Sequence, residues 1–173
     1  CFGSDRYLLQ RSKKYIKRPL SSNTYENNRD EDNRHITSGL SRSGEYSCQI
    51  DTAVEFSTIM NTPIREILPS LGSQLGVCMF LYPLKEMKIF PSELVITMRG
   101  RTGDYNCKRI ELADSIITGE WNRIEATYPI PYVPDEDDCL LAYIWNKGNG
   151  IFYIDDIYIE LLEPQQKNQT TDE

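Results

Sequence analysis

The chain has 173 residues, of which 39% are hydrophobic and 26% are charged, an ordinary composition for one globular domain with short tails. Its net charge of −7 argues against general nucleic-acid binding, because phosphate contacts need a basic surface. No apolar run approaches the roughly 18 residues that a membrane-spanning helix needs.

The first 20 residues form a basic segment. Residues 1–18 contain six Lys or Arg residues and one Asp, a local charge of +5, which leaves −12 for the rest of the chain. The chain begins with Cys1, as processed bacterial lipoproteins do, because that thiol carries their lipid. We therefore predict that residues 1–20 are a tether and that Cys1 is lipidated. The expected location is the cell envelope, anchored to a bacterial membrane and either periplasmic or on the cell surface.

Many short β-like segments follow a charged, Asn-rich stretch at residues 23–34. They are rich in β-branched and aromatic residues, are separated by glycines, and show no long helical period. The predicted strands are 34–37, 45–51, 55–60, 64–68, 75–82, 93–100, 105–112, 120–128, 139–145 and 150–162. Strands at this spacing predict an all-β fold, an antiparallel β-sandwich or jelly roll, over residues 21–163. The polar residues 164–173 are predicted to be a disordered tail.

The last predicted strand, residues 151–161, contains an acidic residue in an apolar setting. Strict alternation of strand side chains would place on one face Tyr153, Asp155, Ile157, Ile159 and Leu161. A carboxylate on such a face is costly unless a metal ion, a cation or several N–H donors compensate it. The sequence therefore predicts one embedded acidic site at Asp155.

The remaining cysteines do not have the spacing of a zinc site. They are Cys48, Cys78, Cys107 and Cys139, and none forms a CxxC pair. One disulfide is compatible with an oxidising compartment, but the sequence leaves its pairing open.

The usual signatures of catalysis are absent. His35 is the only histidine, so no second imidazole can share a metal ion or relay a proton. The sequence contains no GxSxG elbow, glycine-rich phosphate loop or HExxH motif. The acidic run at residues 135–138 is interpreted as a solvated loop. We predict that the protein is not an enzyme; a small hydrolase or lyase using scattered carboxylates and tyrosines is the weakest hypothesis.

Aromatic residues beside predicted turns are the candidate ligand-binding residues, because an exposed ring can stack on a sugar. Trp145 is the first candidate, since Asn146 and other polar residues follow it in a turn. Tyr105 and Tyr132 lie near predicted loops and are further candidates. Trp121 is interpreted as a core residue.

Four short motifs stand in a fixed order over residues 22–163. They are Thr24-Tyr25-Glu26-Asn27, Arg42-Ser43-Gly44-Glu45-Tyr46-Ser47, Glu120-Trp121-Asn122-Arg123 with Tyr128-Pro129-Ile130-Pro131, and Phe152-Tyr153-Ile154-Asp155-Asp156-Ile157. They resemble the Phe-Glu opening, the Ser-Gly-Lys-Tyr-Ser turn, the Trp-to-Ile-Pro stretch and the closing strand of jelly-roll carbohydrate-binding modules. The chain thus resembles a galactose-binding-like jelly roll, of a kind found in Bacteroidetes-type lipoproteins. Tyr25 departs from the Phe of the pattern.

The resemblance implies a structural calcium ion. In the resembling modules, calcium binds the opening Glu, backbone carbonyls of the Ser-Gly turn and the first Asp of the closing pair. The matching positions are Glu26, the backbone of Arg42 and Glu45, and Asp155. Carboxylate and carbonyl oxygens are the ligands that calcium takes. The alternative is that backbone amides or an arginine compensate Asp155.

Two functions are favoured by these observations. The first is a non-catalytic cell-envelope lipoprotein that binds glycan through a concave sheet face or the loops near Trp145. The alternative is a structural or adaptor subunit that docks to another envelope protein by a sheet face or edge. The expected partners are therefore a glycan or an envelope protein, and a membrane through the lipid on Cys1, with no nucleic acid.

Overall fold

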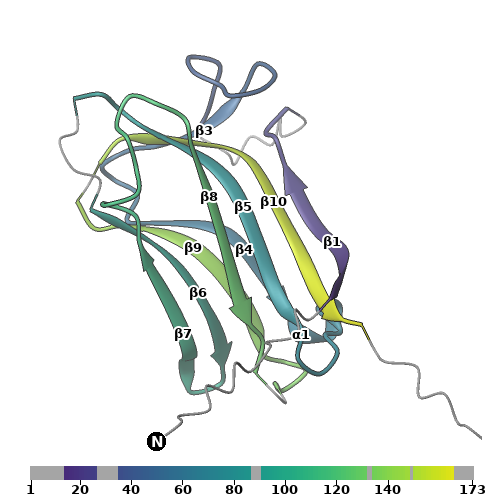
Figure 1. The fold of residues 1–173 in the computed structure, drawn as a ribbon. Coiled ribbons are helices and arrows are strands. Elements are labelled where there is room, and N and C mark those ends of the chain that lie inside the picture. The colour runs from purple at the N-terminus through teal and green to yellow at the C-terminus, as the bar shows by residue number, and fades with distance from the viewer. Residues whose placement is uncertain (1–13, 27–34, 87–90, 132–133, 149, 166–173) are drawn as a thin grey trace, which may run out of the picture.

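Two antiparallel β-sheets pack face to face in the computed structural model, which describes residues 14–26, 35–86, 91–131, 134–148 and 150–165 (Figure 1). Sheet A contains β1 (Tyr15–Asn23), β2 (Ile36–Thr37), β3 (Ser47–Ile50), β5 (Gln74–Pro83), β8 (Asn122–Pro129) and β10 (Phe152–Pro164). Sheet B contains β4 (Phe56–Pro63), β6 (Ser92–Gly100), β7 (Gly103–Glu111) and β9 (Cys139–Asn146). The predicted all-β antiparallel sandwich is confirmed.

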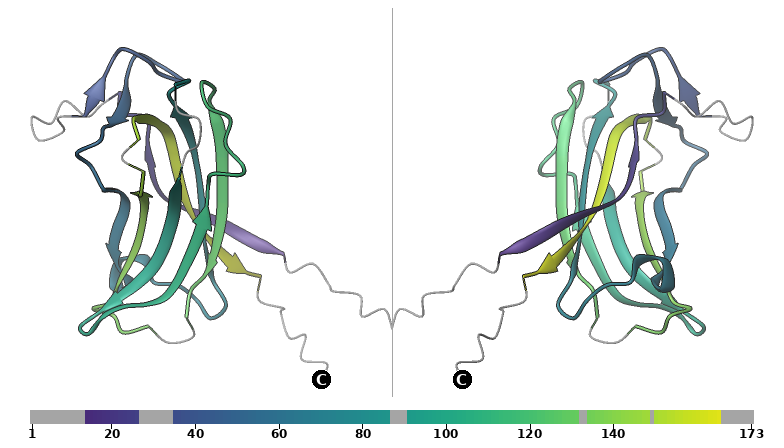
Figure 2. Two further views of the ribbon diagram at one scale, coloured as in Figure 1. Left: turned by 90° about the vertical axis from the view of Figure 1, so that its left-hand side faces the viewer. Right: turned by 90° about the vertical axis from the view of Figure 1, so that its right-hand side faces the viewer.

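The long strand β10 organises sheet A, whose order is β2-β3-β10-β5-β8. One edge of β10 pairs with β3 at residues 152–154 and with β1 from residue 157 to 164. Its other edge pairs with β5. The free ends of β1 and β10 run out together beyond the body of the sandwich (Figure 2). Sheet B has the order β4-β9-β6-β7.

The core lies between the two sheets and follows the two-residue period of strands. On β5 the side chains of Leu75, Met79 and Leu81 are fully buried, and on β6 those of Leu94 and Ile96 are as well. The alternate residues, such as Gly76, Cys78 and Phe80 on β5, point to the other side of the sheet, so each sheet has a second, outer face. The bounds of β5 and β6, and of the strands that pair with them, were predicted to within a few residues.

One predicted strand is instead a single helical turn. Residues 64–68 contain α1 (Ile64–Ile67), whose buried residues Ile64 and Ile67 are three positions apart. A five-residue segment is too short for its hydrophobic period to distinguish a strand from a helical turn. The turn ends at Leu68, which adopts the left-handed conformation with φ 49°.

The predicted boundary between tether and domain is also wrong. β1 begins at Tyr15 and pairs with β10, so part of the basic segment 1–20 belongs to sheet A. Its charged residues face solvent at an edge, where lysine and arginine are common in strands. Similarly, Pro164 ends β10 and is not part of a tail.

The predictions about membrane helices, disulfides, lipidation and the tail concern features outside the two sheets. Among the described residues, no helix is long and apolar enough to cross a lipid bilayer. The cysteines at positions 48, 78, 107 and 139 are all free thiols. Cys1 and residues 166–173 lie outside the described residues, so the lipidation and the tail remain predictions.

The left-handed conformation of Leu68 predicts that glycine is better at this position. A left-handed non-glycine residue costs about 1–2 kcal/mol, and the Leu68 side chain is 71% exposed, so little packing would be lost. After the entropic cost of glycine, about 0.5–1 kcal/mol, Leu68→Gly should raise the free energy of unfolding by about 0.5 kcal/mol. Urea denaturation measures this difference.

Leu71 provides the matched control, because it is 63% exposed and its φ is not positive. Leu71→Gly should lower the free energy of unfolding by about 0.5–1 kcal/mol. Equal losses in the two variants would contradict the backbone strain at residue 68.

Candidate functional site

A β-bulge in β10 determines where the predicted acidic site lies. The register between β10 and β5 shifts after Asp155, and Asp156 has a φ of 48°. Because the bulge adds one residue, Ile154 and Ile157 both enter the core. Asp155 instead pairs with Phe80 on the outer side of sheet A. The predicted grouping of Asp155 with the apolar residues after it is therefore wrong, although its predicted burial is confirmed, with 0% exposure.

The turn at residues 42–46 covers Asp155 and compensates its charge. One carboxylate oxygen accepts hydrogen bonds from the backbone N–H groups of Arg42 at 2.9 Å and Ser43 at 3.3 Å. The other accepts from the N–H of Asp156 at 2.7 Å. Burial raises the pKa of Asp155, and these three N–H donors partly oppose that rise.

Glu26 binds the same turn from another direction. Its Oε1 accepts hydrogen bonds from the N–H groups of Glu45 and Tyr46, both at 2.9 Å. Gly44 lies against this carboxylate with a φ of 61°, and a Cβ at residue 44 would lie 2.3 Å from the Oε1 atom. The turn therefore needs glycine for both its conformation and its packing. Glu26, Arg42, Glu45 and Asp155, which the sequence grouped as a metal site, do meet here.

The groups that face these carboxylates are hydrogen-bond donors. Calcium would take carbonyl oxygens from the turn, whereas Arg42 and Glu45 present their N–H groups to Asp155 and Glu26. The Arg42 guanidinium also binds Asp156 at 2.5 Å. In the described part of the chain, no group of three or more His, Cys, Asp or Glu side chains could hold a metal ion. A calcium ion here would compete with these hydrogen bonds, and it stays a prediction.

The outer side of sheet B carries a second group of aromatic and charged residues. Cross-strand pairing places Phe56, Trp145 and Glu93 in one row across β4, β9 and β6. The next row contains Tyr143 on β9 and, two strands away, Arg109 on β7. Paired residues on neighbouring strands point to the same side of a sheet, so these five side chains share one surface, which we call the sheet B face.

Trp145 is the centre of the sheet B face. Phe56, which is 51% exposed, stacks on it with ring centroids 5.9 Å apart and an interplanar angle of 26°. The Arg109 guanidinium carbon lies 4.7 Å from the centroid of the indole, and the Lys147 Nζ lies 5.6 Å from it. The indole N–H donates to Glu55 at 3.3 Å. These contacts fix the plane of the ring while part of it remains exposed.

Glu93 holds the cations beside this ring. Its carboxylate is buried at 3% exposure and accepts hydrogen bonds from Arg109 Nε at 2.6 Å and Lys147 Nζ at 2.5 Å. Burial alone would raise the pKa of Glu93, but the two hydrogen-bonded cations hold it below its ordinary value. The carboxylate is therefore ionised at neutral pH. A cavity of about 390 Å³ adjoins the row, lined by Thr52, Ala53, Glu55, Trp145, Asn146 and Lys147.

The other predicted ligand-binding residues do not join Trp145 on this face. Asn146 is 1% exposed, and its side-chain amide bonds the backbone of Gly150 and neighbouring loop residues, so it shapes the turn. Tyr105 pairs with the core residue Met98 and donates its hydroxyl to Asp138. Tyr132 lies outside the described residues.

The interpretation of Trp121 as a core residue is wrong, because Trp121 does not belong to the described core between the sheets. It is half-buried outside sheet A and contacts Tyr82, with ring centroids 5.5 Å apart. Sequence reasoning missed Phe56, Glu93 and Arg109 as members of the sheet B face. These residues are brought together only by the pairing register of strands that are far apart in the sequence. No single segment of the sequence therefore indicates them.

Comparisons with known proteins show the fold. No protein-family model matches the sequence, and no curated protein is significantly similar to it. The xylan-binding domain CBM22-1 of Paenibacillus barcinonensis Xyn10C is similar with a TM-score of 0.54 and 12% identity, over 89% of each chain. The tandem CBM22-1-CBM22-2 domain of the same protein gives a TM-score of 0.60 and 13% identity, over 92% of this chain and 49% of that one. The chain therefore has the jelly-roll fold of carbohydrate-binding modules, as its motifs predicted.

Melting experiments test the predicted calcium ion. Protein verified to be metal-free should melt at a higher temperature after calcium is added, because a ligand that binds only the folded state stabilises it. Asp155→Asn should abolish this rise, whereas Asp156→Asn should retain it, because Asp156 binds Arg42 instead. Equal melting temperatures with calcium and with chelator would remove the ion from this site.

The hydrogen bonds of Glu93 predict a pH-dependent contribution to stability. Glu93→Gln should lower the free energy of unfolding at pH 7 by about 1–2 kcal/mol, because it weakens two charge-assisted hydrogen bonds. Because the pKa of Glu93 is lower in the folded state than its ordinary value of 4.5, the ionised carboxylate stabilises the fold at pH values above 4.5. This contribution is lost as the pH falls through the pKa of the folded state. Urea denaturation at pH 7 and pH 3 should therefore show a difference between wild type and variant that shrinks in acid.

Glu111 is the control carboxylate on the same side of sheet B. Its side chain is 73% exposed and lies 3.8 Å from Lys147. Glu111→Gln should change stability little at either pH, because exposed ion pairs contribute about 0–1 kcal/mol. A pH-independent effect of Glu93→Gln would contradict the ionised state assigned to Glu93.

Proposed function

We propose that the protein is a non-catalytic glycan-binding module that holds a neutral polysaccharide on the sheet B face. The observation that carries this proposal is the Trp145 ring, which is stacked on Phe56 and flanked by charged groups that Glu93 fixes in place. These residues come from four strands of one sheet, β4, β9, β6 and β7, so the surface is formed before a ligand arrives.

The chemistry of this surface suits a sugar. A pyranose ring has apolar C–H faces and a rim of hydroxyl groups. Partly exposed aromatic rings such as those of Trp145 and Phe56 cover apolar surface at a small cost in conformational entropy. The planar guanidinium of Arg109 and the carboxylates around it offer hydrogen-bond donors and acceptors to the hydroxyl groups. A few polar groups on an apolar surface fix the orientation of a small ligand.

The charges of the sheet B face favour a neutral ligand. Arg109 and Lys147 both bind Glu93, Lys147 also lies 3.8 Å from Glu111, and Asp104 is paired with Arg99 at 2.6 Å. Because the cations are bound to carboxylates, the surface has no cluster of unpaired positive charge to attract an anionic polymer. A neutral polysaccharide fits this balance.

The fold agrees with this proposal and suggests a first ligand. The similar structures from Paenibacillus barcinonensis belong to a xylan-binding domain and to a tandem domain that includes it. Xylan is a neutral polysaccharide in its unsubstituted form, so it is the first candidate ligand. Hydrolysis of a glycan would need two carboxyl groups placed as general acid and as base or nucleophile. Glu93, the buried carboxylate of the face, is instead bound by two cations.

Loss of the Trp145 ring should weaken glycan binding. Trp145→Ala should raise the dissociation constant for xylan about tenfold or more, because truncating a central aromatic contact costs about 2 kcal/mol or more. Affinity electrophoresis in gels that contain xylan, β-glucan or mannan measures this change as reduced retardation.

Trp121→Ala is the matched control, because it removes another half-buried tryptophan on the opposite sheet. This variant should be retarded like the wild type. If none of the three polysaccharides retards the wild-type protein, the glycan-binding proposal is wrong. If Trp121→Ala abolishes retardation and Trp145→Ala does not, the site is on the other sheet.

A further inference from the structure

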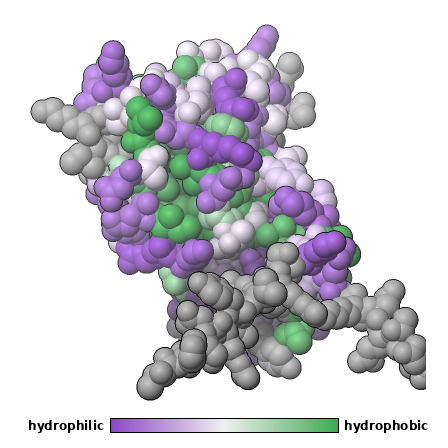
Figure 3. Space-filling model, in the orientation of Figure 1, coloured by the Kyte–Doolittle hydropathy of each residue, from purple (hydrophilic) through white to green (hydrophobic). Residues whose placement is uncertain are grey.

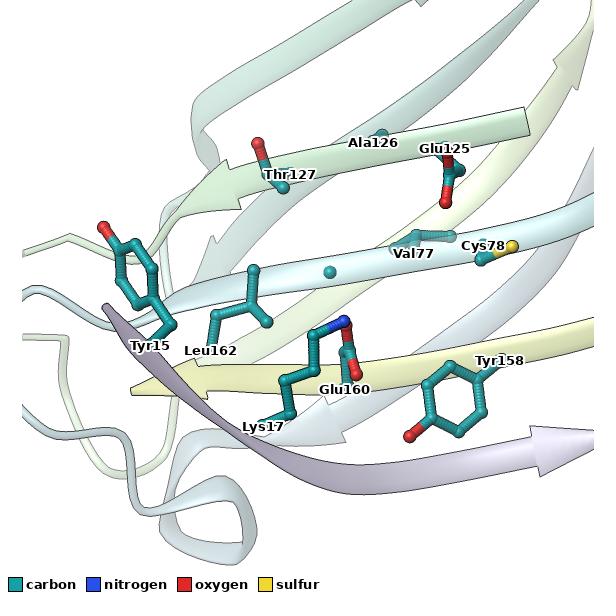
Figure 4. A pocket seen from close by; sticks show the side chains of 11 residues that line it. Tyr15, Lys17, Val77, Cys78, Glu125, Ala126, Thr127, Tyr158, Glu160 and Leu162 are labelled. Atoms are coloured by element: carbon teal, nitrogen blue, oxygen red, sulfur yellow. The ribbon is translucent and has the colours of Figure 1, made fainter. Parts of the chain in front are cut away.

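The outer side of sheet A contains a groove that is unrelated to the sheet B face. Its volume is about 590 Å³, and it lies over β5 between β8 on one side and β10 with β1 on the other (Figure 4). We call it the β5 groove. The residues that line it include Tyr15, Gly76, Cys78, Glu125, Tyr158 and Glu160.

Side-chain size along three adjacent strands forms this groove. In one row, Gly76 on β5 lies between Thr127 on β8 and Glu160 on β10. In the next row, two residues along, Cys78 lies between a glutamate on β8, Glu125, and a tyrosine on β10. Small residues on the central strand between larger residues on both neighbours leave a trough that follows β5.

Gly76 allows a carboxylate to lie across the floor. A Cβ at residue 76 would lie 3.0 Å from the Cγ of Glu160, closer than ordinary contact. Glu160 lies over this position and binds Lys17 from β1 at 2.8 Å. Glycine inside a strand weakens it and often marks a place where another group approaches closely. Here Gly76 keeps the trough open and leaves room for the Glu160 side chain to lie over it.

Two tyrosines lie at opposite ends of the groove (Figure 4). Tyr158 is 38% exposed. At the other end, the Tyr15 hydroxyl accepts a hydrogen bond from the Gln74 side-chain amide at 2.8 Å, which fixes its position. Tyr15 pairs with Pro164, six residues after Tyr158 on β10, so the backbone positions of the two tyrosines are roughly 20 Å apart along the strand. This length suits an extended chain better than a single small molecule.

The charged residues around the groove are paired with one another. Lys17 binds Glu160, and Arg123 binds Glu125 at 2.6 Å. The two pairs balance, so the groove favours neither an anionic nor a cationic polymer. The visible face of sheet A in Figure 3 has hydrophobic residues in its middle and hydrophilic residues around them. Aromatic rings, an apolar floor and balanced polar groups are the same combination as on the sheet B face.

We propose that the β5 groove is a second binding site for a neutral oligosaccharide, so that the protein binds glycan chains on two opposite faces. This inference rests on the proposed function for the class of ligand, but the two sites share no residue. Two sites on opposite faces would let one molecule join two glycan chains, or bind one surface more tightly through both.

Titration of the Trp145→Ala variant tests this site separately from the first. The ¹⁵N-labelled full chain, as wild type and as Trp145→Ala, is titrated with xylohexaose, cellohexaose and mannohexaose, and its backbone amide signals are followed by NMR. The proposal expects at least one hexasaccharide to shift the signals of residues 76–78, 125–127 and 158–160 in both proteins. Signals of the sheet B face should shift in the wild type alone.

The other outcomes separate the two proposals. If Trp145→Ala removes every shift, the β5 groove is not a site and the sheet B proposal stands. If only groove signals shift in the wild type, the sheet B proposal fails and the groove proposal stands. If no signal shifts with any of the three hexasaccharides, both proposals are overturned.

A matched pair of tyrosine variants checks that the groove itself binds the sugar. Tyr158→Ala in the Trp145→Ala background should weaken the remaining binding at least tenfold. Tyr46→Ala is the control, because Tyr46 is 37% exposed against 38% for Tyr158 and does not line the groove. Equal binding by the two double variants would overturn the assignment of Tyr158.

Discussion

The β-bulge at Asp156 is the constraint on which the rest of sheet A depends. β10 pairs with three strands, and the bulge reverses which of its residues face the core. Without the extra residue, Ile154 and Ile157 would point to opposite faces. The bulge keeps both in the core and leaves Asp155 on the outer side, where a bare carboxylate would be costly. The turn at residues 42–46 must then close over it, which links the opening segment at Glu26 to the last strand.

The sandwich could be predicted from the sequence because its central strands follow simple rules. On β5 and β6 every second residue points into the core, and turn residues separate the two strands from their neighbours, although the outward residues of β6 are also mostly buried. The bulge could not be predicted by the same rule, since one residue with positive φ reverses the face to which each later residue of the strand points. The burial of Asp155 was therefore predicted correctly from an incorrect grouping. Asp at positive φ is more common than most residues, so the Asp155-Asp156 pair was the available signal.

The candidate site was predictable only in part, for a related reason. Trp145 stands out because a polar turn follows it. Its partners Phe56 and Arg109 lie 89 and 36 positions earlier in the chain, and only the order and register of sheet B bring them together. Glu93 looked like any surface carboxylate in the sequence, yet two cations from other segments make its burial tolerable.

The pairing of the first described strand with the last gives the molecule an uneven resistance to force. Tyr15 and Pro164 are cross-strand partners at one end of sheet A, so tension applied at these two residues would pull them directly apart. Antiparallel hydrogen bonds run perpendicular to the strands, and β1 would peel from β10 a few bonds at a time rather than slide along it. Lys17 would leave with β1, which removes part of one wall of the β5 groove. Sheet B contains neither residue, so this tension would not act directly on its strands. Tension would thus open the β5 groove before it reached the sheet B face.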